Sequence, residues 1–428
     1  MQRFSCRICS QNVPYINLYW DVGLLVSPRW LKNGQESSNF FMQTEIEKAA
    51  RISTRYRIAC ITNSYETSLC TDEWRSLVAK STSCEKIYQS PEFFRFLVKS
   101  RHCKSDRFEL FTVSDDQDRI LGILPLRWSS INLDFRIGSF VFYSYRVSVI
   151  RLLGSLPMLG EPRAFRNEVM NGLLDRFPDR AAILMQSFPI EEKDNLQPNS
   201  RVKFSVIHGW RICHTIPVPD QFDSYLQKFS AKKRYNMARE IRLLKRELGT
   251  MCLTRIEHPS DVPELFDCLN ALNPWPGDRS VNKDEYTIFA ENNISLSYSL
   301  RANGEFIAAV LGSRYGDTWH VHRIYFAQKY RHLSPGSVTM HLAIEDVMRH
   351  FSFAQIDFGF GTPTYKWAST HALKKRATVL VSRRKNRVNF IFSLFVLYDE
   401  FHSRLAKLVI TAAKVIGAKA RRLSTIRQ

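Results

Sequence analysis

The chain has 428 residues, of which 44% are hydrophobic and 24% charged, a composition that excludes a disordered or fibrous protein and suffices for two or three packed domains. The 61 lysines and arginines against 41 acidic residues give a formal charge of +20, so the surface favours anionic partners. Phosphate-bearing small molecules, anionic glycans, nucleic acid and an anionic membrane face all satisfy that charge, as does a basic surface with no partner.

The N-terminal part shows neither a metal-site pattern nor a targeting segment. Cys6 and Cys9 form a CxxC pair, but no second pair or suitably spaced histidines follow, so we expect no zinc and a reducing, cytoplasmic location. Residues 1–30 contain no continuous apolar run, which argues against a signal peptide or membrane span there. Residues 1–65 lack a clean period and are interpreted as a poorly ordered N-terminal extension.

Residues 66–212 alternate between helix and strand patterns. Thr71 and Ser90 are of the type that caps a helix, and Ser90 is followed by a proline suited to the first helical turn. A polar turn at 115–118 separates two strand patterns and predicts a hairpin. The predicted elements are helices that begin after Thr71 and Ser90, strands over 108–113 and 120–128, a helix over 169–177 and a strand over 181–188.

Residues 213–388 repeat this order. Asn303 and Gly304 form a strong turn signal between two strand patterns, which predicts a second hairpin. The predicted elements are strands over 295–301 and 306–313, a helix over 339–351 and a strand over 354–360. The shared order predicts two copies of one mixed α/β unit, over 66–212 and 213–388; two unrelated α/β pieces are the alternative.

Two basic helices frame the second copy. The helix from residue 231 begins with a cluster of cations that includes Lys232 and Arg234, where backbone N–H groups also favour an anion; a solvated face explains the same residues. Residues 389–428 are predicted to form a basic amphipathic helix. We expect its apolar side to pack on the core, with a membrane surface as the alternative. That side consists of Phe401, Leu405, Leu408, Val409, Ala412 and Ile416.

The segment from 316 to 370 carries the most chemistry-bearing residues. Arg331 precedes the sequence Ser334-Pro335-Gly336-Ser337, in which a proline at a helix start and small neighbours let backbone N–H groups approach a pyrophosphate. His320 and His322 share one face of a predicted strand, so His322 is the candidate base, with His320 as the second candidate. Structural histidines, which are commoner in a half-buried strand, are the alternative. Arg323, on the opposite face, is a candidate contact for a substrate carboxylate.

A second candidate site follows a buried strand. Asp357 is followed by Gly359 and Gly361, which fit either an ordinary turn or a close approach to a ligand. Tyr365 and Lys366 come next, and a tyrosine hydroxyl beside a lysine can protonate a leaving thiolate or hold a carboxylate.

Three stretches, "LQKFSAKKRYNMAREIRLLKREL", "SPGSVTMHLAIEDVM" and "IDFGFGTPTYKWAS", resemble landmarks of the CelD-like and FemAB-like branch of the GNAT superfamily. They spread over 222–370, and "ILGILPL" resembles part of the family's first half. The resemblance implies a tandem GNAT-like fold with a degenerate first domain, and acyl-CoA as the donor. It places functional residues at Lys232 and Arg234, and at Asp357, Gly361, Tyr365 and Lys366. One departure is that Arg331-His332-Leu333-Ser334-Pro335-Gly336 replaces the familiar phosphate loop.

The expected reaction is transfer of an acyl group from acyl-CoA to an amine, without a metal, through direct attack on the thioester. The acceptor implied by the resemblance is an amine on a sugar or small molecule used in envelope polysaccharide or lipid assembly. Two alternatives stay open: a Fem-like transferase that uses aminoacyl-tRNA, and a catalytically inactive module that binds glycan or nucleic acid. No G-x-S-x-G, H-E-x-x-H or P-loop sequence supports a hydrolase, zinc protease or NTPase.

Overall fold

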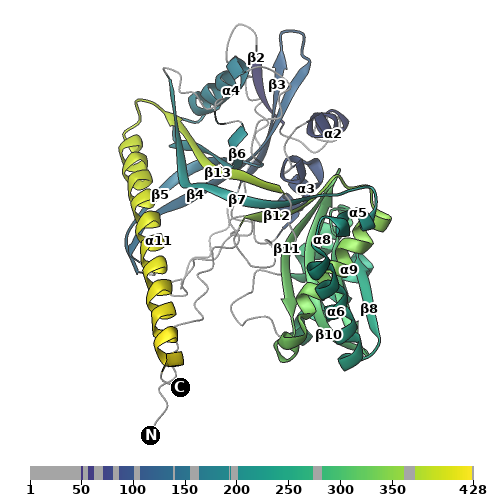
Figure 1. The fold of residues 1–428 in the computed structure, drawn as a ribbon. Helices are drawn as coiled ribbons and strands as arrows, with labels where there is room; N and C mark the ends of the chain where they lie inside the picture. Colours follow the sequence, from purple (N-terminus) through teal and green to yellow (C-terminus); the bar gives the residue numbers. More distant parts are fainter. Residues whose placement is uncertain are drawn as a thin grey trace, which may run out of the picture.

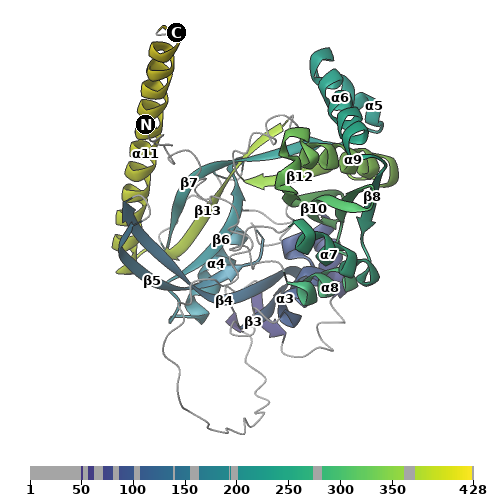
Figure 2. The ribbon, with the colours of Figure 1, turned by 90° about the horizontal axis from the view of Figure 1, so that it is seen from below.

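The computed structural model describes residues 50–51, 56–61, 71–80, 86–100, 107–137, 140–154, 163–191, 193, 201–272, 282–360 and 372–426. Its strands form one mixed sheet in the order β1-β2-β3-β4-β5-β6-β13-β7-β12-β11-β10-β9-β8. The expected mixed α/β architecture with a C-terminal helix is therefore confirmed. Figures 1 and 2 show the sheet with the long C-terminal helix at one side and a group of helices at the other.

The first half of the chain supplies the strands of one side. Its elements are β1 (Ala50–Arg51), β2 (Tyr56–Ile61), α2 (Thr71–Lys80), η1 (Lys86–Gln89), α3 (Pro91–Lys99), β3 (Phe108–Asp115), β4 (Ile120–Ile137), β5 (Phe140–Leu152), α4 (Arg163–Arg176), β6 (Ala182–Pro189) and β7 (Val202–Pro217). The strands β1 and β2 fall in the stretch to which the sequence assigned no element. β2 pairs with β3 in antiparallel register, so this part of the extension completes the sheet edge.

The second half supplies the other side and the C-terminal helix. Its elements are α5 (Phe222–Gln227), α6 (Ala231–Leu248), β8 (Met251–Ile256), η4 (Pro259–Asp261), α7 (Val262–Leu272), α8 (Lys283–Glu291), β9 (Ser297–Ala302), β10 (Glu305–Tyr315), β11 (Thr318–Phe326), η5 (Gln328–Leu333), α9 (Pro335–His350), β12 (Gln355–Phe360), β13 (Ala372–Arg383) and α11 (Val388–Ile426). The β9–β10 turn has positive φ at Asn303 and Gly304, as the turn signal predicted.

The two halves have the same topology. In the first, β2 to β5 are antiparallel neighbours and β5 runs parallel to β6 after the α4 crossover. In the second, β8 to β11 are antiparallel neighbours and β11 runs parallel to β12 after the α9 crossover. A parallel pair needs a crossover of this kind, which the helix in each half provides.

The halves exchange their last strands. β13, from the end of the second half, lies between β6 and β7 of the first half and is antiparallel to both. β7, from the end of the first half, then pairs with β12 of the second. The two units therefore share one continuous hydrogen-bonded sheet, and neither has a complete sheet without a strand from the other.

The helices bury one apolar stripe each against this sheet. Around α9 the buried cluster includes Trp319, Ile344 and Val347, while α4 packs into a separate cluster with Val169 and Leu173. In α11, Phe392 and Phe395 are buried against β4 and β7. The expectation that its later apolar side packs on the core is wrong at Phe401, Leu405 and Leu408, whose side chains are exposed.

Candidate active site

The parallel pair β11–β12 opens after three residue pairs. Thr318, Trp319 and His320 pair with Gln355, Ile356 and Asp357, and the ladder ends there. β11 nevertheless continues to Phe326, paired with β10. The second half of β11 is therefore free of β12 on that side. His320 and Asp357 mark the point at which the strands diverge.

A β-bulge lies in the diverging half of β11. Leu311 pairs with Arg323, whereas the next residue, Gly312, pairs with Val321, so His322 is the extra residue. Such a bulge disrupts the ladder and re-aims the side chain. The His322 Nε2 atom lies 2.8 Å from the Ser313 hydroxyl. Burial, together with the neighbouring His320 and Arg323, lowers the pKa of His322 to about 3, so the imidazole is neutral at physiological pH.

Asp357 is buried, and its carboxyl group is held in the ionised form. Burial alone would raise the pKa of its carboxyl, but the Arg376 guanidinium, His320 and the Gly359 N–H hold that pKa below its usual value. The Arg376 Nη2 atom donates to Oδ2 at 3.1 Å, and the Gly359 N–H donates to Oδ1 at 2.7 Å. A carboxylate satisfied in this way is a poor proton acceptor. Its geometry fits a residue that fixes β12 at the divergence, where the ladder with β11 ends.

His320 completes this buried cluster. Its Nδ1 atom is 3.9 Å from Asp357 Oδ2, and its ring lies beside Tyr88, with 6.1 Å between ring centroids. Burial lowers the pKa of His320 to about 4, more than the Asp357 charge raises it. Its Nε2 atom is buried and has no hydrogen-bond partner within the described ranges. The first half of the chain thus reaches the divergence through Tyr88 of η1.

The residues of the predicted phosphate site come together at the start of α9. Ser334 has left-handed φ of 55° and its hydroxyl makes no capping bond, so it leaves the N–H groups of the first turn without the cap that a serine at this position usually provides. A Cβ on Gly336 would lie 3.2 Å from Ile324 Cγ2, so the missing side chain lets the helix start lie against β11. Ser337 is half-buried in the same turn and Arg331 is exposed just before it. An anion at this helix end would lie beside the diverging half of β11.

The two other cations predicted for a site lie elsewhere. α6 begins beside the middle of α9, where Lys233 lies near His341, and Leu244 near its end packs with residues at the start of α9. Lys232 and Arg234 are therefore not beside Arg331. Arg234 instead donates to the Phe229 carbonyl at 2.6 Å.

Four predicted residues remain. Arg323 is half-buried on β11, and its Nη1 atom donates to the Tyr325 hydroxyl at 3.1 Å. Gly361, Tyr365 and Lys366 lie outside the described residues, so their predicted roles stay predictions. Among the residues that are described, no three histidine, cysteine, aspartate or glutamate side chains gather as metal ligands.

Sequence reasoning missed Arg376 and the bulge. Arg376 follows two half-buried or exposed lysines and looks like a third surface cation, yet it is 1% exposed. The signal available was Asp357 itself, because a carboxylate in an apolar strand requires a buried cation or donors. The identity of His322 does not predict the bulge, since any residue can occupy the extra position.

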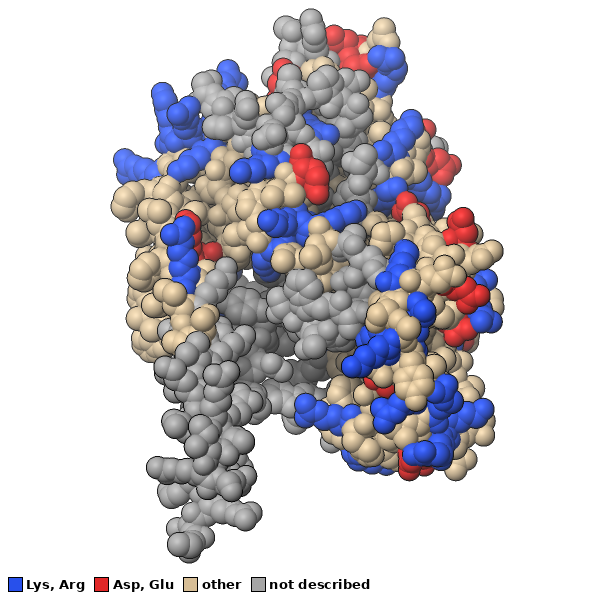
Figure 3. Space-filling model, in the orientation of Figure 1, with Lys and Arg blue, Asp and Glu red and all other residues tan. Residues whose placement is uncertain are grey.

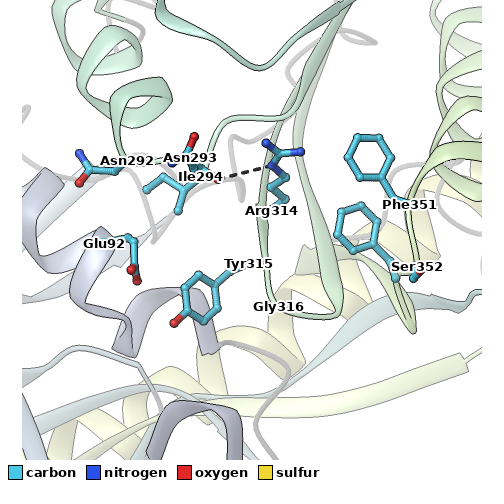
Figure 4. A pocket seen from close by; sticks show the side chains of 10 residues that line it. Glu92, Asn292, Asn293, Ile294, Arg314, Tyr315, Gly316, Phe351 and Ser352 are labelled. Carbon is cyan, nitrogen blue, oxygen red and sulfur yellow. Dashed lines mark hydrogen bonds between the residues drawn. The ribbon is translucent and has the colours of Figure 1, made fainter. Parts of the chain in front are cut away.

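A pocket of about 540 Å³ lies at the other end of β11 (Figure 4). It is bordered by the β10–β11 turn, the start of β12, α3 and the end of α8. Arg314 reaches across it, with its Nε atom donating to the Asn293 carbonyl at 3.4 Å, and Phe351 and Phe353 stack with 5.1 Å between centroids. Because α9 starts at the opposite end of β11, this pocket is separate from the predicted phosphate site.

Comparison with known proteins shows which family model and which solved structures the chain resembles. Residues 231–367 match the family model described as an acetyltransferase (GNAT) domain. The crystal structure of FemX has a TM-score of 0.52 and 10% identity, covering 79% of this chain and 99% of FemX. A tandem GNAT protein from the clavulanic acid biosynthesis pathway has a TM-score of 0.45 and 10% identity over 77% of this chain and 98% of that one. A conserved protein of unknown function from Bacteroides thetaiotaomicron has a TM-score of 0.48 and 14% identity over 73% and 97%.

A search of curated proteins found none that matches the chain. The matched segment spans β8 to β12 with α6 and α9, the half that carries the diverging strands. The protein therefore has a double-domain GNAT-like fold, as the resemblance implied, and its second half contains the segment that matches the GNAT domain model.

Proposed function

We propose that the protein is an N-acyltransferase that moves an acyl group from acyl-CoA to an amine. The observation that carries the proposal is the juxtaposition of an uncapped helix N-terminus at Ser334 with the open, bulged half of β11. The first provides N–H groups for the donor's phosphates, and the second provides a strand that has parted from β12, beside which the acyl arm could lie. The family of the second half supports the same class of reaction.

In the proposed reaction the amine nitrogen attacks the thioester carbonyl, a C–N bond forms and the C–S bond breaks. The thiolate leaves and takes up the proton that the amine loses. Arg331, Ser334, Gly336 and Ser337 would hold the donor. His322, neutral because of burial, would orient the acceptor or relay its proton, with Ser313 fixing its ring.

The proposal extends to Tyr365, Lys366 and Gly361 as neighbours of the leaving thiol, and to Lys232, Arg234 and Arg323 as acceptor contacts. We further propose that the reaction takes place in the cytoplasm. The acceptor would be an amine on a sugar or small molecule used in envelope polysaccharide or lipid assembly.

The test is thermal stabilisation of the purified protein by acetyl-CoA, a long-chain acyl-CoA and free CoA. We expect saturable stabilisation by at least one acyl-CoA, weakened about tenfold in apparent affinity by Arg331→Ala, because one phosphate contact is lost. Arg146→Ala, which removes an exposed arginine of β5, is the matched control and should leave the affinity unchanged. A free-thiol assay with candidate amines then tests turnover.

The second candidate is a Fem-like transfer from aminoacyl-tRNA, which the fold shared with FemX favours. No response to any CoA species, together with salt-sensitive binding of charged tRNA, would replace the first proposal with this one. Saturable binding of acyl-CoA with no thiol release from any acceptor tried would instead favour a binding module.

A further inference from the structure

α11 has a second apolar face that none of the described residues covers. Its inner face holds the buried Phe392 and Phe395. The outer face carries an exposed stripe at spacings of three and four residues: Phe390, Leu394, Leu397, Phe401, Leu405 and Leu408. A stripe of 18 helical steps is about 27 Å long. Leu397, Phe401 and Leu408 are each at least 65% exposed, so the stripe is accessible along its length.

The end of the β4–β5 hairpin extends this surface. Ile137, Phe140, Phe142 and Tyr143 are between 52% and 72% exposed. Tyr398 of α11 fixes the hairpin, since its hydroxyl accepts from the Arg136 N–H at 2.6 Å and its ring lies 4.9 Å from that of Phe135. We call the hairpin end and the α11 stripe together the apolar edge. An exposed apolar surface of this extent marks a docking site.

Cations border the apolar edge. Arg384, Lys385 and Arg387 are exposed in the turn that leads into α11. Figure 3 shows a mostly uncharged surface on the left side of the molecule, interrupted by a few charged side chains, with lysines and arginines gathered above it. From residue 401 to the end the sequence has seven lysines and arginines and no acidic residue: Arg404, Lys407, Lys414, Lys419, Arg421, Arg422 and Arg427.

We infer that the apolar edge docks the protein on the surface of an anionic phospholipid bilayer. Phenylalanine and leucine side chains would enter the acyl boundary while the bordering cations lie at the headgroups. A second copy of this chain is a poorer partner, because the same cations would face each other across the interface. No helix in the described part of the chain is long and apolar enough to cross a membrane, so docking would be peripheral.

The test is co-sedimentation of the full-length protein with vesicles of phosphatidylcholine alone and with one quarter phosphatidylglycerol. We expect binding to the anionic vesicles, weak binding to the neutral ones, and at least about a tenfold loss of affinity in Leu397→Glu/Phe401→Glu. Val98→Glu is the matched control, because Val98 is 57% exposed on α3 and lies outside the apolar edge.

Three results would overturn the inference. One is the same vesicle affinity for the double variant and the wild type, or no binding to anionic vesicles. Another is a wild-type dimer by light scattering that the double variant converts to a monomer, which would make the apolar edge an interface between copies. The last is a clearly lower melting temperature for the double variant than for Val98→Glu, which would mean that part of the chain covers the stripe. None of these readouts depends on the proposed activity.

Discussion

Arg376 and Asp357 form a buried ion pair across an intervening strand. Their side chains are both 2% exposed and 3.1 Å apart, although β7 lies between β13 and β12. The pair therefore joins the exchanged strand β13 to the point at which β11 and β12 diverge. Removing one partner of a buried ion pair strongly destabilises the fold, because the remaining charge has neither water nor a counter-ion.

Asp357→Asn should reduce the free energy of unfolding by roughly 3–5 kcal/mol, because it leaves the Arg376 guanidinium buried without its counter-charge. Urea denaturation measures the change. The double variant Asp357→Asn/Arg376→Met should be more stable than the single one, since both charges are gone. Glu345→Gln, which breaks a surface pair with Arg349, is the control and should cost less than about 1 kcal/mol. Equal losses in the single and double variants would contradict the pairing.

His320 should make stability depend on pH in a defined window. Its folded pKa of about 4 lies below an unfolded value of about 6.5, so the unfolded chain binds more protons between these pH values. Stability should therefore fall as pH drops from 6.5 towards 4, by up to roughly 1.4 kcal/mol per pH unit from this residue. Urea midpoints at pH 7, 6 and 5 should show a shallower slope for His320→Gln.

The control for that slope is His332→Gln, which changes an exposed histidine of η5 and disturbs no buried group. Asp357 contributes in the same direction but at lower pH. Its folded pKa is depressed, so its stabilisation is present above the unfolded value near 3.9 and is lost as pH falls through the folded one. A slope confined to pH below 4 would attribute the effect to carboxylates instead of His320.

Gly336→Val should weaken donor binding and lower stability together. A Cβ there meets Ile324 and, at 3.3 Å, Phe326 Cδ1, so the added side chain pushes the start of α9 away from β11. We expect a loss of about 1–3 kcal/mol in unfolding free energy and at least about a tenfold weaker acyl-CoA affinity. Ser337→Ala, in the same turn, adds no atoms and should retain the stability. Unchanged affinity in a folded Gly336→Val protein would place the donor elsewhere.

Tyr398→Phe should loosen the end of the β4–β5 hairpin. The variant removes the hydroxyl that bonds the Arg136 backbone while leaving the ring packed on Phe135. We expect a loss of about 1 kcal/mol and faster amide hydrogen exchange at Arg136 and its neighbours. Tyr235→Phe, at a residue 62% exposed on α6, should change neither. Equal exchange at Arg136 in both variants would show that packing alone holds the hairpin.

Local patterns predicted much of the fold because they depend on neighbours in sequence. Ser90 caps α3 by accepting from the Phe93 N–H at 3.1 Å, and Asn303-Gly304 makes the predicted turn. The strand exchange could not be read in this way, because β7 and β13 have strand patterns that suit several neighbours. Arg376 was missed for the same reason. Its counter-charge, Asp357, lies 19 residues earlier in the sequence and on β12, the second strand from β13 in the sheet.

The candidate site shows the same difference between residues that are close in sequence and residues that meet only in the fold. Arg331, Ser334, Gly336 and Ser337 were predicted as a group because they lie in one short stretch of sequence at one helix start. Lys232 was predicted as a separate contact, and the structure places it away from this helix start, because α6 runs beside α9 in the opposite direction. The outer stripe of α11 was predicted as apolar but assigned to the core, since periodicity shows that a face is apolar and not what covers it.

The exchange of β7 and β13 has a consequence for synthesis of the chain. The first half lacks the strand between β6 and β7 until residues 372–383 have been made, by which time most of the protein has left the ribosome. Until then β6 presents an open edge of unpaired N–H and C=O groups that another strand could occupy. The halves cannot mature one after the other as independent domains do, so the nascent first half depends on late completion of the sheet or on protection of that edge.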